Sequence, residues 1–208
     1  MKIQQFVLKI LMLLAFTIIC NGVTAQSELK VFQDWATTSG TQNFFYKNII
    51  KTDANGNVFV AGATVNDSNN YDILVAKYNS RGILQWMQQY DGAGHGDDMA
   101  VGLYVDTSGN VYTTGATMTL TTNSDVVTIK YSSSGAQQWI VTYNGTGSLY
   151  DAGADLMTDA SGNVYITGTS FNANGNTDVI TVKYNSSGTQ QWVSPYNYSA
   201  NLNDGGRS

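Results

Sequence analysis

The sequence predicts an all-β protein: a β-propeller built of four-stranded antiparallel blades, of which this chain holds an incomplete arc of about three blades plus partial ends. One observation is an internal repeat of 53 residues, and another is that each unit contains four short β-favouring runs separated by turn residues. Three kinds of position keep the period: the turn motif that starts at Asp53, Asp106 and Asp159, the lysines Lys77, Lys130 and Lys183, and the tryptophans Trp86, Trp139 and Trp192.

The second unit shows the four expected strands, at 99–105, 110–117, 126–131 and 137–143. In the turn from Asp106 to Gly109 the carboxylate can accept a backbone N–H two residues on, and the glycine can adopt a positive φ. A turn from Ser132 to Gly135, with the same spacing to its glycine, joins the third and fourth strands. Two hairpins in succession predict a four-stranded meander.

The third strand of this unit predicts that both faces of the sheet are covered. One face carries Val127, Ile129 and Tyr131, and the other carries Val126, Thr128 and Lys130. A strand with one solvated face alternates more cleanly between apolar and polar residues, so we expect each sheet to pack between two neighbours. A linear β-solenoid is the alternative architecture, but its coils are usually shorter and rarely contain two hairpin turns.

The N-terminus predicts export. Lys2 and Lys9 precede an apolar stretch from Ile10 to Ile19, and small residues follow it at 23–25, which is typical of a signal peptide over 1–25, cleaved after Ala25. The stretch is about half the ~20 residues that a membrane-spanning helix needs. Cys20, the sole cysteine, would suit lipid attachment, but Ile19 before it is larger than that reaction normally accepts. The mature chain therefore has no disulfide and no thiolate site.

Residues 26–208 are expected to form the repeat region, with units at about 43–90, 97–143 and 150–196. A strand near 31–38 that contains Trp35 resembles the fourth strand of a unit, and we expect it to close the ring with a blade at the other end. A fourth unit is expected to start near residue 203. Because closed propellers have four to eight blades, the chain is interpreted as a fragment of a longer protein.

The charge of the chain excludes one class of partner. The formal net charge is −5 and no basic cluster occurs, so nucleic acid is not expected to bind. His95 is the sole histidine, which rules out a usual zinc site with two histidines, and no Gly-x-Ser-x-Gly motif supplies a serine nucleophile. We therefore expect no enzyme activity, no cofactor and a solvated loop around His95.

The repeat resembles a known family. Its pattern is Asp-x-x-Gly-Asn-Val-Tyr-x-x-Gly followed by Asp-x-x-x-x-Lys-Tyr-x-x-x-Gly-x-x-x-Trp, and it extends from about Trp35 to Asp204. This pattern is similar to that of the seven-bladed β-propeller repeat (SBBP) family of secreted bacterial proteins, common in the Bacteroidota. The resemblance implies an extracellular or cell-surface propeller, often joined to other modules, and it carries no shared catalytic motif.

Three sets of repeated residues are candidates for chemistry. The tryptophans could stack on carbohydrate, but their recurrence favours packing between blades. The lysines could form a ring of charge, but we expect their stems to pack on a blade and their ammonium groups to reach solvent or a turn carboxylate. Asp98, Asp151 and Asp204 precede the first strand of successive units; they could bind Ca²⁺, although turn capping is the favoured interpretation. The Gly-rich loop at 91–98 is expected to be a connection between blades.

The sequence thus predicts a non-enzymatic secreted or cell-surface binding or scaffold module, with an unknown protein or glycan ligand at the blade loops and the missing C-terminal blades as its partners in the same chain. The alternative is part of an extracellular carbohydrate-active enzyme whose catalytic residues lie outside this fragment. A purely structural spacer is a third possibility.

Overall fold

The computed structural model describes residues 48–120, 123–197 and 204, all of which belong to one compact unit spanning 39–208; the other unit, 1–38, lies outside the described residues. The described part contains twelve strands and no helix, in three sheets of four strands each. No helix that is long and apolar enough to cross a membrane occurs among these residues.

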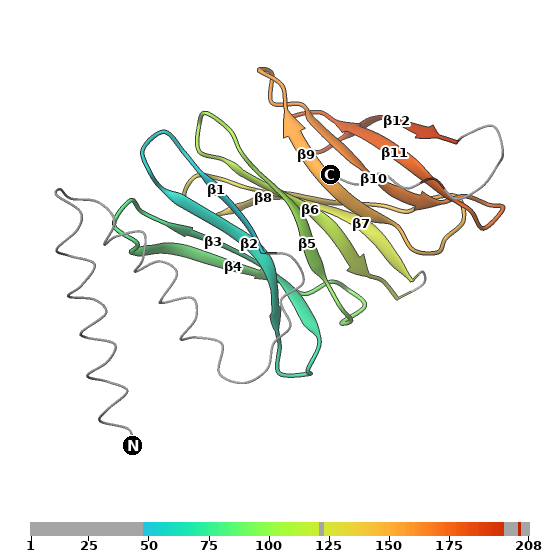
Figure 1. The fold of residues 1–208 in the computed structure, drawn as a ribbon, viewed down its shortest axis with the longest axis horizontal. Helices are drawn as coiled ribbons and strands as arrows, with labels where there is room; N and C mark the ends of the chain where they lie inside the picture. Colours follow the sequence, from blue (N-terminus) through green and yellow to red (C-terminus); the bar gives the residue numbers. More distant parts are fainter. Residues whose placement is uncertain (1–47, 121–122, 198–203, 205–208) are drawn as a thin grey trace, which may run out of the picture. The chain divides into compact units, whose positions relative to one another are not determined.

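Each sheet is one repeat unit, folded as an antiparallel meander (Figure 1). The first sheet holds β1 (Ile49–Thr52), β2 (Val58–Val65), β3 (Tyr71–Tyr78) and β4 (Leu84–Tyr90). The second holds β5 (Met99–Val105), β6 (Val111–Met118), β7 (Ser124–Tyr131) and β8 (Gln137–Tyr143). The third holds β9 (Ala152–Thr158), β10 (Val164–Phe171), β11 (Thr177–Tyr184) and β12 (Gln190–Tyr196).

The predicted strands of the second unit are confirmed, with one difference in length. The hairpin of β6 and β7 extends further than predicted, because Asp125 pairs with Thr117 and Ser124 pairs with Met118. Ser124 and Asp125 are polar residues that do not signal a strand by themselves, but the register that the apolar residues set in the middle of the hairpin carries them along.

The turns have the predicted chemistry. Asp106 Oδ1 accepts the backbone N–H of Ser108 at 2.9 Å, and Gly109 has a φ of 79°. Asn110, the last residue of the motif, donates from its side-chain amide to Asp106 Oδ2 at 2.8 Å. Both carboxylate oxygens are therefore occupied, which explains why asparagine follows the glycine in every copy of the motif.

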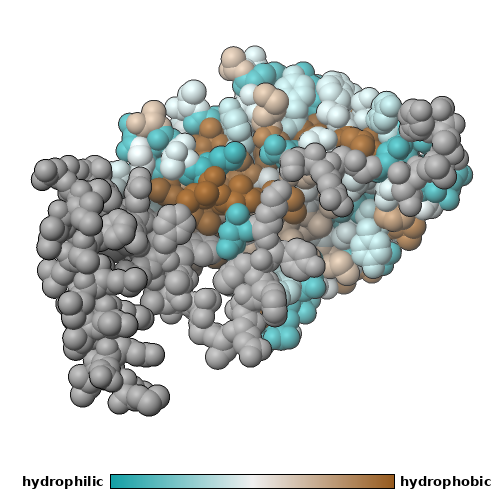
Figure 2. All heavy atoms as spheres, in the orientation of Figure 1, coloured by the Kyte–Doolittle hydropathy of each residue, from teal (hydrophilic) through white to brown (hydrophobic). Residues whose placement is uncertain are grey.

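The second sheet is covered on both faces, as predicted. One of its faces contributes Leu103, Val127 and Ile129 to a core that it shares with the first sheet. Its opposite face contributes Tyr112 and Val126 to a core that it shares with the third sheet. Hydrophobic residues gather in the middle of the surface seen in Figure 2, and hydrophilic residues lie toward its edges. The all-β, blade-like architecture is thus confirmed for the three units, and closure of a ring remains a prediction.

Candidate functional site

The junction between neighbouring sheets is built by one lysine and one tryptophan of each unit. In all three units the pairing of the third and fourth strands shifts register directly after the lysine, so that Lys77 lies opposite Trp86, Lys130 opposite Trp139, and Lys183 opposite Trp192. Residues that pair directly across two antiparallel strands project from the same face of the sheet. Each unit therefore presents an ammonium group and an indole N–H side by side.

Both donors bind one backbone carbonyl of the next unit. Lys77 Nζ donates to the carbonyl oxygen of Ser133 at 3.2 Å, and Trp86 Nε1 donates to the same oxygen at 3.1 Å. At the next junction Lys130 and Trp139 bind the carbonyl of Ser186 in the same way, at 3.4 and 3.1 Å. At these two junctions the lysines donate to a turn carbonyl, which was not expected, while both side chains stay partly exposed and Lys77 also interacts electrostatically with the turn carboxylate of Asp53.

The turn that supplies the carbonyl also provides a flat backbone surface on which the indole ring packs. Gly135 lies so close to Trp86 that an added Cβ would fall 2.7 Å from the ring, and Gly188 stands in the same relation to Trp139 at 2.9 Å. Both glycines have a positive φ. Packing of the tryptophans between sheets is therefore confirmed for these two residues, and glycine is required there for its backbone angle and for its lack of a side chain.

The lysines are held over aromatic rings of their own sheets. The ammonium nitrogens of Lys77, Lys130 and Lys183 lie 5.3, 5.2 and 5.1 Å from the ring centres of Phe59, Tyr112 and Tyr165, respectively. This is the range of cation–π attraction. Each lysine side chain is thus held in position by a ring of its own sheet, in addition to any contact with the next unit.

The third sheet presents the same donors without an acceptor in the part of the chain that the structure describes. Trp192 is 42% exposed, whereas Trp86 and Trp139 are only partly accessible. Tyr196 on the neighbouring stretch of β12 is 59% exposed. The interpretation of all three tryptophans as packing residues is therefore confirmed for two of them, and Trp192 lies on the surface.

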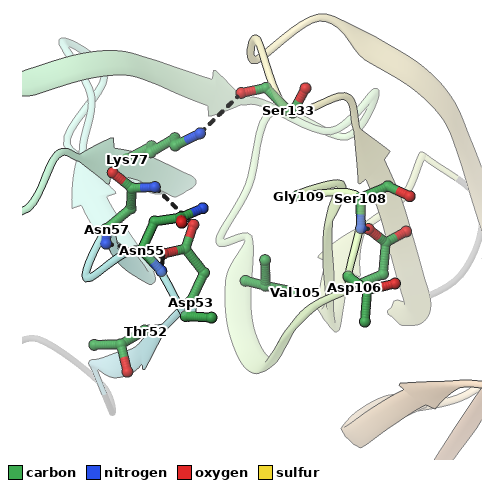
Figure 3. Close-up of a pocket in the computed structure, with 12 residues that line it drawn as sticks. Thr52, Asp53, Asn55, Asn57, Lys77, Val105, Asp106, Ser108, Gly109 and Ser133 are labelled. Atoms are coloured by element: carbon green, nitrogen blue, oxygen red, sulfur yellow. Dashed lines mark hydrogen bonds between the residues drawn. The ribbon is translucent and has the colours of Figure 1, made fainter.

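A cavity of about 450 Å³ lies between the first and second sheets, next to the turns that begin at Asp53 and Asp106. Figure 3 shows Asp53 and Asp106 on its two sides, with Val105 between them and the hydrogen bond from Lys77 to Ser133 above. Its lining surface is mixed, polar and apolar, and the residues that contribute polar side chains to it are Thr52, Asp53, Asn55, Asn57, Lys77, Asp106, Thr107, Ser108 and Ser133. We call this space the junction groove.

The carboxylate of Asp53 in the junction groove is held in its charged form. Burial tends to raise its pKa, but hydrogen bonds from the Asn57 side chain and from the backbone N–H groups of Asn57 and Asn55 outweigh burial, and the pKa is lowered overall. A general acid needs the opposite shift. Asp53 is therefore suited to accepting hydrogen bonds and not to donating a proton.

The calcium candidates are hydrogen-bonded within the fold. Asp98 is fully buried and accepts the N–H of Gly92, the N–H of Met118 and the hydroxyl of Thr117. Asp151 likewise accepts the N–H groups of Gly145 and Phe171. These contacts support turn capping, and Ca²⁺ coordination stays a prediction. Burial raises the pKa of Asp98, against the effect of its hydrogen bonds.

Asp204 has a related backbone contact. Its N–H donates to the carbonyl of Thr177 at 2.6 Å, as the N–H of Asp98 does to Tyr71 and that of Asp151 does to Ser124. Asp204 thus makes the same backbone contact as its two equivalents, and the start of a fourth unit near residue 203 stays a prediction.

The loop at 91–98 connects the first two sheets, as predicted, and brings three carboxylates together. Single oxygens of Asp72, Asp91 and Asp98 lie within 4.8 Å of one another. Asp72 is bound by Asn66 and Gln89, and Asp91 pairs with His95 at 2.8 Å. The hydrogen bond to Asp91 raises the pKa of His95, whose side chain is exposed. Among the described residues this is the single grouping of this kind.

Two residues that matter at these junctions were not found from the sequence. Ser133 and Ser186 act through a backbone carbonyl, for which residue type carries no signal. Asp72, Asp125 and Asp178, the aspartates of the repeat pattern, are buried, but no role was assigned to them from the sequence. The predicted signal peptide, Cys20, and the closure strand at 31–38 with Trp35 lie outside the described residues.

Comparison with known proteins places the chain in no family. No family model matches it, and no curated protein matches it. Among solved structures, it is similar to a fucose lectin from Kordia zhangzhouensis, determined in complex with methyl-fucoside, with 16% sequence identity over 72% of this chain and 99% of that chain and a TM-score of 0.42. A TM-score this low does not establish a common fold.

Proposed function

We propose that this chain is part of a secreted or cell-surface propeller of the SBBP type that binds a hydroxyl-rich ligand, such as a glycan, without converting it chemically. One observation carries the proposal: the repeated polar and aromatic side chains are used to join sheets, and the junction groove is the space that they leave open. The proposal concerns the groove between the first and second sheets.

The lining of the junction groove supports a ligand rich in hydroxyl groups. A hydroxyl both donates and accepts hydrogen bonds. The groove offers a remaining acceptor site on Asp53 Oδ2, the hydroxyl of Ser108, and donors on Asn55 and Lys77. Asn55 and Ser108 lie on exposed turns, so their side chains are accessible from outside. The backbone N–H groups of these two residues donate to Asp53 and Asp106, which orders the turns and lowers the entropy lost on binding.

The lowered pKa of Asp53 argues against hydrolysis at this groove. Glycoside hydrolysis needs one carboxylic acid with a raised pKa beside a second carboxylate. Asp53 is held as a carboxylate by its hydrogen bonds. Catalysis by residues outside this chain is the second candidate, and it predicts product release by the longer protein only.

The test is a glycan array probed with the purified chain, followed by calorimetry on each glycan that binds. Asn55→Ala and Ser108→Ala each remove one side-chain contact and keep the turn. We expect each to weaken binding about 2- to 10-fold, the effect of one hydrogen bond. Ser161→Ala changes the equivalent position of the third unit and should leave affinity unchanged. If no glycan binds, or if all three variants weaken binding equally, the proposed site is wrong; release of sugar fragments would show that the chain is an enzyme.

A further inference from the structure

The two end sheets carry complementary halves of one junction. The outer face of the third sheet offers the donor pair Lys183 and Trp192, which repeats the arrangement that binds the next unit at the two inner junctions. The first sheet offers the matching turn, from Asn79 to Gly82. We call these the donor face and the acceptor face.

The turn of the acceptor face has the geometry of the two turns that receive a tryptophan. In it the N–H of Asn79 donates to Ile83 and the N–H of Gly82 donates to Asn79, both at 2.9 Å, and Gly82 has a φ of 75°. The turn from Asn185 to Gly188 has the same pair of bonds, at 2.9 and 3.0 Å. Ser80 thus stands where Ser186 stands, and its carbonyl accepts no hydrogen bond from any described residue.

The acceptor face is also apolar around that turn. Met87 is 55% exposed, and its equivalent in the second unit, Ile140, packs against the core shared with the first sheet. Leu84, which pairs with Tyr78, is 46% exposed. On the donor face, Trp192 and Tyr196 are exposed as well. Exposed apolar residues that recur at junction positions mark an interaction surface.

We propose that the occupant of the donor face is the acceptor face of a second copy of this chain. Lys183 and Trp192 of one copy would bind the Ser80 carbonyl of the other, with the indole ring seated on Gly82. Such a contact is head to tail, since the two surfaces differ, and it either closes into a ring or continues as an open series. The proposal depends on the junction geometry and not on the glycan ligand.

The first measurement is sedimentation velocity of the purified chain over a wide concentration range. We expect the average mass to rise to at least twice that of one copy. Trp192→Ala removes the donor face, and Met87→Lys places a charge on the acceptor face; each variant alone should remain monomeric. Leu120→Lys is the matched control, because Leu120 is 79% exposed in the β6–β7 loop and belongs to neither face, and it should associate like the parent.

Mixing the two monomeric variants is the decisive measurement. The Trp192→Ala copy keeps its acceptor face and the Met87→Lys copy keeps its donor face, so the mixture should form a heterodimer joined by one intact contact. Circular dichroism of each variant confirms that it is folded. A parent chain that is monomeric at every concentration would overturn the proposal. So would association that survives both substitutions, or association that Trp192→Ala abolishes and Met87→Lys does not.

Discussion

Replacing Trp139 by alanine should destabilise the protein far more than replacing Trp192, although the two occupy the same position of the repeat. Trp139 packs on Gly188, lies edge-on to Tyr112 at 6.3 Å and donates a hydrogen bond to Ser186. Trp192 lies at a comparable 6.2 Å from Tyr165, but it is 42% exposed and donates to none of the residues that the structure describes. The comparison thus isolates the contact with a following sheet.

The size of the difference follows from area and hydrogen bonding. A buried aromatic side chain covers about 150–250 Å², and each Å² is worth about 25 cal/mol. Since Trp139 is only partly buried, its removal should cost about 2–3 kcal/mol from packing and about 1 kcal/mol from the lost hydrogen bond. For Trp192 we expect about 1 kcal/mol. The difference of about 2 kcal/mol corresponds to about 4–8 °C in melting temperature for a domain of this size.

The assay is urea unfolding followed by far-ultraviolet circular dichroism, which does not depend on tryptophan emission. Trp86→Ala should behave like Trp139→Ala, because Trp86 makes the equivalent hydrogen bond and packs on the equivalent glycine one junction earlier. Equal free energies of unfolding for the Trp139 and Trp192 variants would refute the reasoning. The sheets would then not be held together by these junctions.

Three further predictions test the turns and the core. Gly188→Ala should cost about 2–4 kcal/mol of unfolding free energy, because the new Cβ meets the indole ring of Trp139. Gly175→Ala should cost about 1 kcal/mol, because Gly175 has a similar φ of 79° but open space around it. Equal losses of the two variants in urea unfolding would contradict this prediction. Asp151→Ala should cost about 3 kcal/mol, because two backbone N–H groups lose their acceptor, and unchanged thermal unfolding would contradict it. Burial raises the pKa of Tyr131 and of Tyr184 to about 12. Because the unfolded chain releases these protons near pH 10, stability should fall between pH 10 and 12, by up to about 2–3 kcal/mol for each tyrosine, and Tyr184→Phe should flatten this dependence in urea titrations.

The repeat period made the fold predictable. An exact interval fixes which residues are equivalent, and the lack of clean alternation between apolar and polar residues within 126–131 then indicates that both faces of a sheet are buried. The ends of the strands were less predictable. Asp125 and Ser124 belong to β7 only because the register of the hairpin extends to them, and register is a property of the pair of strands.

The candidate site was predictable only on its donor side. Lys77 and Trp86 recur, so they stood out in the sequence, but their shared acceptor is the backbone of Ser133. A carbonyl is present in every residue, and only the fold determines which one faces the donors. The register shift after Lys77 could not be predicted either, because the extra residue of a β-bulge has no distinctive residue type.

The shared use of a main-chain oxygen at both junctions that the structure describes has an evolutionary consequence. Because the acceptor is a backbone carbonyl, it does not depend on the side chain of the residue that carries it. Ser133 can therefore be replaced by another residue while the junction is kept. An in-frame duplication or loss of one 53-residue segment also joins surfaces that already fit. Genes of this design can therefore change in length by whole modules without inventing a new interface each time.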